Sequence, residues 1–291
     1  MGLSLIVVLL ITTAAIAHAM WNVAIKRART TGPVFIWLTF AVGAVVFAPF
    51  GITSIIGEGV DLARLAPLAL GSGALQVGYF LLLQRAYSAA DVSVVYPLAR
   101  GSGPLLSVIA AIALFGERPG LTGILGALVV VAGVVVIGLA GGRATAHRAG
   151  VLYGLAVGVL IAGYTVWDTA AVTTGGMPVV ALYWSSIVVQ LALLAPAALR
   201  RRATLVEAAR IHWPTALVVG VLSPLAYMLI LVAVQLAPLS IVAPAREVSV
   251  VLVGLAGWLL FREPHPLQRL LGAGIVLTGV ALLAIDSSGV H

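Results

Sequence analysis

The sequence contains no cysteine, and this absence excludes disulfides, thiolate metal sites and cysteine nucleophiles. Charged residues are also scarce, at 9% of 291 residues, and nine of them are acidic. A soluble domain of this size needs a far more polar surface. The chain is instead 62% hydrophobic, with a mean hydropathy of +1.18. These values indicate an integral membrane protein.

Apolar runs recur along the whole chain. They lie at about 3–25, 34–50, 66–87, 92–115, 120–140, 150–172, 178–198, 214–236, 239–261 and 267–285. Runs of roughly 17–24 residues are long enough to cross a hydrocarbon core of about 30 Å as helices. We therefore predict an all-α integral membrane protein of ten transmembrane helices, joined by short loops and embedded in a lipid bilayer.

Basic residues are unevenly distributed between the predicted loops. One set of alternate loops holds twelve: Lys26, Arg27, Arg29, Arg85, Arg143, Arg148, Arg200, Arg201, Arg202, Arg210, Arg262 and Arg269. The other set holds two, Arg64 and Arg118. By the positive-inside rule the first set is cytoplasmic, which places both termini on the non-cytoplasmic side. The basicity is thus a topology signal and does not indicate nucleic-acid binding. The excess of arginine over lysine, with abundant Ala, Gly and Val, favours a bacterial inner membrane.

The two halves of the chain resemble each other at an offset of 146 to 147 residues. The matching parts are 18–22 and 164–168, 86–97 and 233–244, Arg100 and Arg246, and Glu117 and Glu263. Five helices per half is an odd number, so the second copy must enter the membrane in the opposite orientation. We predict two inverted five-helix repeats, 1–145 and 146–291. Inverted repeats are the usual architecture of alternating-access secondary transporters.

Arg100 and Arg246 occupy matching places near the middle of their predicted helices. An arginine at this depth costs about 2.5–3.5 kcal/mol on insertion scales, so both side chains should point into the bundle or into a wet cavity. Each follows a helix-breaking proline, Pro97 or Pro244. The carbonyls that a proline frees are tolerated at this depth only where a cavity or neighbouring helices satisfy them.

Two interpretations of these arginines stay open, internal ion pairs or ligands along a substrate path with such pairs as gates. Glu247 and Asp168 are the acidic residues deep enough to pair with them. Arg246 and Glu247 are adjacent and should diverge by about 100° on a helix, so we expect them not to face each other. Glu247 could instead reach Arg100, and Asp168 could meet Arg246.

Other polar and aromatic residues form helical stripes in both halves. The candidates to line a shared central cavity are His18, Trp21, Asn22, Gln76, Tyr79, Tyr96, Tyr164, Trp167 and Tyr227. A single stripe of this kind is usually interhelical glue, and Trp21 and Trp167 could belong to interfacial belts. The runs at 120–140 and 267–285 are glycine-rich instead, which indicates close helix packing within the fold or in a homodimer.

No cofactor site is visible in the sequence. The "GSG" segments at 71–73 and 101–103 lack the spacing and lysine of a phosphate loop. Four of the five histidines lie in predicted loops or at the terminus, without metal-ligand spacing. We therefore expect no cofactor, no metal and no enzymatic activity.

The chain resembles EamA-type members of the drug/metabolite transporter superfamily in three motifs. These are "WN" followed by Lys26 near the end of the first run, "FGERP" at the end of the fourth run and "FREP" at the end of the ninth. "HAMWN" with "YPLARGSGPLL" is similar to a subgroup found beside phosphonate-utilisation genes. The resemblance covers essentially the whole chain. It implies transport of small metabolites, often amino acids, sugars or phosphorylated compounds, by proton coupling or exchange. The small four-helix multidrug relatives couple protons through a glutamate in their first helix, whereas the first run here has no acid.

The leading hypothesis is a secondary transporter of a small anionic or zwitterionic metabolite. Arg100 and Arg246 would bind its acidic group, because the forked donors of guanidinium match carboxylate, phosphate or phosphonate. Asp168, Glu247 and His18 are the candidates for proton coupling or gating, since they can titrate and arginine cannot. The alternatives are export of apolar or cationic compounds, or a flippase for a lipid-linked head group, with the arginines in structural ion pairs.

Overall fold

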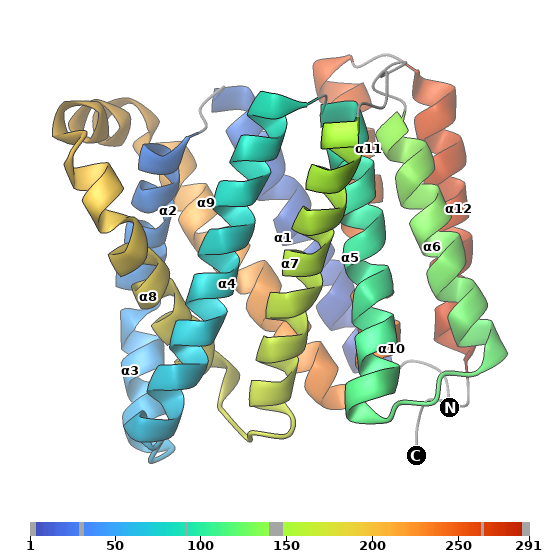
Figure 1. The fold of residues 1–291 in the computed structure, drawn as a ribbon, viewed down its shortest axis with the longest axis horizontal. Helices are drawn as coiled ribbons and strands as arrows, with labels where there is room; N and C mark the ends of the chain where they lie inside the picture. The colour runs from blue at the N-terminus through green and yellow to red at the C-terminus, as the bar shows by residue number, and fades with distance from the viewer. Residues whose placement is uncertain (1–3, 29–31, 91, 140–147, 263–264, 287–291) are drawn as a thin grey trace.

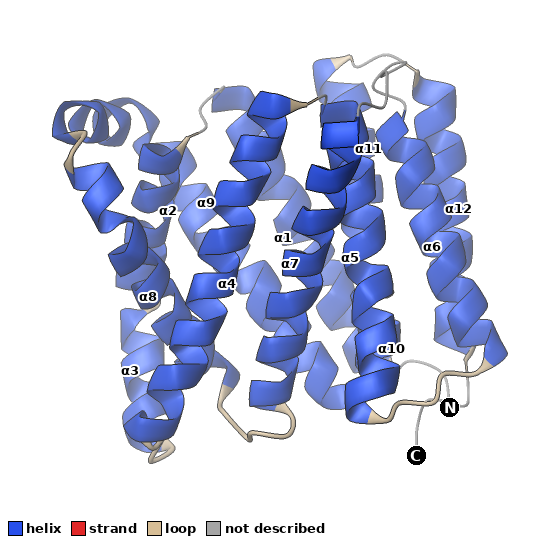
Figure 2. Ribbon diagram, viewed as in Figure 1, coloured by secondary structure: helices blue, strands red, loops and turns tan. Residues whose placement is uncertain are grey.

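The structure is a computed structural model that describes residues 4–28, 32–90, 92–139, 148–262 and 265–286. All regular elements in these residues are helices (Figure 2). They are α1 (Leu5–Ala28), α2 (Pro33–Val46), α3 (Ala48–Gly57), α4 (Leu62–Ala89), α5 (Val92–Phe115), α6 (Leu121–Leu139), α7 (Arg148–Val172), α8 (Val179–Leu199), α9 (Arg202–Leu236), α10 (Leu239–Ala245), α11 (Val248–Phe261) and α12 (Pro266–Ile285). A helix bonds all its backbone groups internally, which a lipid-exposed span requires.

The described helices provide nine candidate membrane spans, or ten if one bent pair is counted as a span. Nine intervals, among them 239–261 with α10 and α11 together, are long and apolar enough to cross a membrane. A tenth forms if α2 and α3, bent by 50°, count as one. This agrees with the predicted ten-helix, all-α membrane fold. The bend coincides with Pro49 in the first turn of α3, where the proline ring cannot continue the preceding helix.

One predicted boundary is far from the observed one. α9 begins at Arg202, well before the predicted start of its apolar run at 214. Its first turns contain Arg202, Glu207 and Arg210, so hydropathy alone did not reveal them as helical.

Helices of the first half pack against helices of the second. α6 lies beside α12, α5 and α4 beside α7, α1 beside α9 and α11, and α2 beside α8 and α9. In Figure 1 the α6–α12 pair stands at one edge of the bundle and α2, α3 and α8 at the other. The predicted division between the repeats, at 145 and 146, lies outside the described residues.

Two tryptophans make equivalent contacts in the two repeats. The indole N–H of Trp37 in α2 donates to the carbonyl of Leu191 in α8, at 3.0 Å. The indole N–H of Trp184 in α8 donates to the carbonyl of Ala44 in α2, at 2.9 Å. The two donors, Trp37 and Trp184, are 147 residues apart, and so are the two acceptors, Ala44 and Leu191. Each repeat therefore donates the equivalent hydrogen bond to the other.

The glycines of α6 and α12 are used within the fold. A Cβ at Gly133 would lie 2.8 Å from the carbonyl oxygen of Gly272, and one at Gly279 would lie 2.8 Å from that of Gly126. The backbones of α6 and α12 are therefore in direct contact at these glycines, and an added methyl group would force them apart. A homodimer stays a prediction, and these glycines no longer argue for it.

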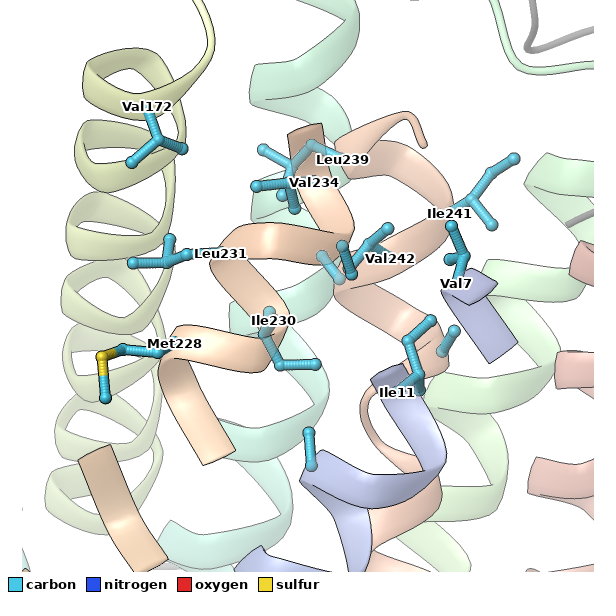
Figure 3. Packing of buried hydrophobic residues seen from close by; sticks show 14 of the residues in the cluster. Val7, Ile11, Val172, Met228, Ile230, Leu231, Val234, Leu239, Ile241 and Val242 are labelled. Atoms are coloured by element: carbon cyan, nitrogen blue, oxygen red, sulfur yellow. The ribbon is translucent and has the colours of Figure 1, made fainter. Parts of the chain in front are cut away.

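α10 lies deep in the core. Figure 3 shows Ile241 and Val242 of α10 near Val7 and Ile11 of α1, and all seven residues of α10 are buried. Its first turn is held by Glu117, in the loop after α5. The Glu117 carboxylate accepts from the backbone N–H groups of Leu239 at 2.8 Å and Ser240 at 2.9 Å. These N–H groups have no partner within the helix, so an acid from the first repeat caps the broken span of the second.

Most of the exposed basic residues at helix ends, within the described residues, lie at one end of the bundle. Arg27, Arg148, Arg200 and Arg262 are exposed at helix ends on this side, whereas Arg118 follows the opposite end of α5. The start of α1 and the end of α12 lie together at the end away from the arginines (Figure 1). That the arginine-rich end is cytoplasmic stays a prediction.

Candidate functional site

Arg100, Arg246 and Glu247 meet in the interior of the bundle. The Nε atom of Arg100, on α5, lies 3.5 Å from Oε2 of Glu247, and that of Arg246 lies 3.4 Å from Oε1. The Glu247 side chain is 1% exposed, Arg246 10% and Arg100 17%. The expected contact of Glu247 with Arg100 is present, and the two arginines of the repeats share one carboxylate.

The expectation that Arg246 and Glu247 diverge was wrong. It assumed a continuous helix, but α10 ends at Ala245 and α11 begins at Val248. Pro244 has no N–H to continue the ladder, and the backbone N–H of Glu247 bonds to Pro244 in a tighter turn. The break brings the two neighbouring side chains to the same side.

The shared ion pairs are not reinforced by hydrogen bonds. Neither oxygen of Glu247 has a hydrogen-bond donor among the described residues, and Nε and Nη2 of Arg246 have no acceptor. Two guanidiniums also face one carboxylate, so the cluster has an excess positive charge. An incoming anion would find unused donors on Arg246.

Residues of α1 and α7 flank the arginines. The Nη2 atom of Arg100 lies 3.2 Å from Nε2 of His18, and Nη1 of Arg246 donates to the Thr165 hydroxyl at 3.3 Å. The His18 ring stacks edge-on against Trp21, whose buried indole N–H has no partner in the described chain. Asn22 donates to the carbonyl of His18, at 2.7 Å. Thus His18 contacts the arginine cluster directly, and Trp21 and Asn22 contact His18.

A second polar cluster surrounds Asp168, which is 0% exposed. Its Oδ2 atom accepts from the Tyr227 hydroxyl at 2.9 Å and from the Gln76 amide at 3.4 Å. Asp168 forms no ion pair with Arg246, contrary to the pairing considered from the sequence, and its Oδ1 atom has no partner among the described residues. Predicted residues of α4, α7 and α9 therefore meet at one point.

Tyrosines connect the two clusters. Tyr164 packs edge-on against Tyr79 and Tyr227, with ring centroids 5.7 Å apart in each pair. Tyr227 also contacts Tyr183, at 4.9 Å. Tyr96 is half-buried one turn before Arg100 on α5. The row supplies aromatic surface between the arginine side and the aspartate side.

Trp167 lies apart from this interior site. Its side chain is 40% exposed, and its indole N–H donates to the carbonyl of Leu68 at 2.9 Å while the ring covers Gly71. Leu155 and Val159 of α7 are also exposed. Trp167 thus joins α7 to α4 from outside, unlike its repeat counterpart Trp21.

Several residues of the site were missed in the sequence. Ser72 and Ser186 are completely buried with their hydroxyl oxygens 2.9 Å apart, and Gln190 donates to Ser186 at 3.2 Å. Ser186 and Gln190 are four residues apart, the same spacing that identified His18 and Asn22. That spacing could have revealed them, whereas nothing local distinguishes Thr165.

Two adjoining pockets lie near the end of α7, apart from both clusters. One is an apolar groove of about 440 Å³ between α5 and α7, lined by Leu114, Phe115, Val166 and Trp167 among others. The second, of about 350 Å³, shares Leu114 and Phe115. It adds polar residues, namely Glu117, Thr169, Thr173 and Thr174. In the described part of the chain, no three histidine or acidic side chains are placed to hold a metal ion.

Comparison with known proteins bears on both halves of the chain. The profile of the EamA-like transporter family matches residues 5–139 and again 148–285. No match to a curated protein was found. One crystal structure of a protein superposes with a TM-score of 0.77, covering 96% of this chain and 97% of the other, at 20% sequence identity. That likeness shows the shared fold.

Proposed function

The chain belongs to the EamA-like transporter family, and from this premise we propose that it is a secondary-active, alternating-access transporter of a small anionic or zwitterionic metabolite. As a family member it is a multi-pass membrane transporter of the drug/metabolite transporter superfamily. The anionic substrate is our own inference. We place the protein in a bacterial inner membrane with its arginine-rich end in the cytoplasm.

One observation carries this proposal. Arg100 and Arg246 converge on the single carboxylate of Glu247, and two nitrogens of Arg246 lack acceptors. Buried charges and unused donors are costly when nothing pairs with them. An acidic substrate group would supply both the missing charge and the missing acceptors, as guanidinium binds carboxylate and phosphonate in a forked geometry.

The broken span gives this binding a mechanical consequence. Arg246 and Glu247 lie between α10 and α11, and α10 packs against α5 of the other repeat. A substrate anion that displaces Glu247 from the arginines would alter the contacts at this break. Since broken helices at repeat interfaces are where transporters of this architecture bind and rearrange, the break is our candidate for coupling occupancy to alternating access. His18, Glu247 and Asp168 are the interior groups through which a proton could be coupled.

The test is ligand-induced thermal stabilisation of purified protein. The panel contains organic acids, phosphonates, amino acids and cationic drugs, applied to the wild type and to Arg100→Gln and Arg246→Gln. Arg64→Gln is the matched control, because Arg64 is exposed and donates to the carbonyl of Gly175, far from the interior site. We expect stabilisation by acids that both interior variants lose and the control keeps. Stabilisation by cations or apolar compounds alone, retained in the variants, would instead identify the arginines as a structural pair.

A second candidate function is a flippase for a lipid-linked head group. The apolar groove beside Trp167 adjoins the pocket lined by Glu117, Thr169 and Thr173. An acyl chain would fit the apolar groove, and its polar head group would fit the adjoining polar pocket. Reconstituted vesicles containing a fluorescent head-group-labelled lipid test this candidate. Ala162 lines the apolar groove, so protein-dependent flipping that a bulky substitution at Ala162 blocks would favour this candidate over transport of a soluble metabolite.

A further inference from the structure

Asp168 is a buried acid with an unused acceptor. It is 0% exposed, and within the described chain no lysine, arginine or histidine pairs with it. Tyr227 and Gln76 both donate to Oδ2, which leaves Oδ1 without a partner. An ionised carboxylate in this position requires a cation or further donors.

The arginine cluster has the opposite imbalance. Arg100 and Arg246 together carry one more charge than Glu247 neutralises, and Nη2 of Arg246 has no acceptor. The described interior therefore holds a locally positive group and a locally negative group that do not pair with each other. Counting Asp168 as ionised, the four side chains sum to zero charge.

Helix α7 sets the spacing between these two groups. Thr165 accepts from Arg246, and Asp168 lies three residues further along the same helix. Both are buried on the same face, about 4.5 Å apart along the helix axis at 1.5 Å per residue. Tyr164 and Tyr227, with ring centroids 5.7 Å apart, lie beside them. Aromatic faces attract organic cations.

We propose that Asp168 binds the cationic group of a zwitterionic substrate whose acidic group is held by Arg246 and Arg100. This rests on the proposed function, which supplies the role of the arginines. A zwitterion neutralises both local imbalances and adds no net charge to the membrane interior. A plain anion would leave Asp168 unpaired, and a plain cation would leave the arginine cluster positive. Asp168 thus selects for an ammonium group, while the arginines select for the acid.

Matched compounds separate the two subsites. The probes are glycine, β-alanine, 4-aminobutyrate, 5-aminopentanoate and 2-aminoethylphosphonate. Each is paired with the acid that lacks the amino group, namely acetate, propionate, butyrate, pentanoate and ethylphosphonate. Apparent affinities come from concentration-dependent thermal stabilisation of purified wild-type protein, at constant pH and ionic strength. We expect at least one zwitterion to bind at least about tenfold more tightly than its twin acid, the paired compound without the amino group. One hydrogen bond to a charged group supports a ratio of this size.

Asp168→Asn should erase this preference and leave the affinity for the twin acids unchanged. The control is Asp61→Asn, since Asp61 is an exposed cap of α4 that accepts from the backbone N–H of Ala63, and it should keep the full preference. The melting temperature of each variant without ligand checks that it still folds.

The outcomes distinguish this inference from the proposed function. Wild-type protein that binds each acid as tightly as its zwitterion would overturn the Asp168 subsite and leave the anion site intact. Retention of the zwitterion preference in Asp168→Asn would do the same. If neither zwitterions nor acids bind while Arg246→Gln behaves as wild type, both this inference and the proposed anion site are wrong.

Discussion

The side chains of Arg246 and Glu247, neighbours in the sequence, face each other across a break in their own helix, with Nε 3.4 Å from Oε1. The same carboxylate lies 3.5 Å from Arg100 of the other repeat. Neither contact is a hydrogen bond, because both Glu247 oxygens lack donors in the described chain. The two arginines are therefore held to Glu247 by charge, and charge is what a substrate ion can compete for.

Glu247→Gln should destabilise the protein and make it more responsive to anions. Removing one partner of a buried ion pair costs about 3–5 kcal/mol, because the remaining charge is left uncompensated. The melting temperature without ligand should fall, and a carboxylate added at constant ionic strength should raise it more than in the wild type. Glu207→Gln, at an exposed position of α9, should change neither quantity. An unchanged melting temperature in Glu247→Gln would show that the pairing contributes no stability.

Glu117→Ala should destabilise the protein through a helix cap. The substitution removes the acceptor for the N–H groups of Leu239 and Ser240, and loss of an N-terminal cap costs about 0.5–2 kcal/mol. Thermal unfolding in detergent measures the loss. Glu58→Ala is the control, because the exposed Glu58 follows α3 and its carboxylate accepts from Ser54 in that helix. Equal effects of the two substitutions would contradict the capping role.

Gly279→Ala should be far more harmful than Gly274→Ala in the same helix. A Cβ at Gly279 would lie 2.6 Å from the backbone nitrogen of Val130, whereas one at Gly274 meets no atom within 4 Å. Overpacking of this kind costs about 1–3 kcal/mol. Alanine in an open helical position instead gains up to about 1 kcal/mol over glycine. Melting temperatures of the two variants, compared with wild type, test the packing of α6 on α12, and a similar shift in both would refute it.

The absence of cysteine makes the orientation directly measurable. Arg118→Cys and Arg201→Cys each introduce a single thiol at an exposed position, at opposite ends of the bundle. A membrane-impermeant maleimide added to intact spheroplasts should label the first variant. The second should be labelled only after permeabilisation, because the arginine-rich end is expected to face the cytoplasm. The reverse pattern would invert the proposed topology.

Much of the fold could be predicted because a bilayer leaves few structures to choose from. Long apolar runs must become helices, since lipid offers no partner to free backbone groups. The register of 146 to 147 residues and the alternating loop charges then determine two inverted halves. Trp37 and Trp184 show that relationship as reciprocal bonds between α2 and α8. The central positions of Arg100 and Arg246 likewise required no structure, because a fixed charge at that depth must point inward.

The sequence by itself thus determined a ten-span membrane fold and the inward placement of two arginines. Only the tertiary structure decided which residues meet them. Helical spacing separates Arg246 from Glu247, and the break after Ala245 reverses that expectation. Trp21 and Trp167 match in sequence, yet one lies beside His18 and the other covers α4 from outside. These differences arise because the contacts between side chains depend on how helices of opposite repeats pack and bend. The spacing of residues along one helix carries no information about that packing.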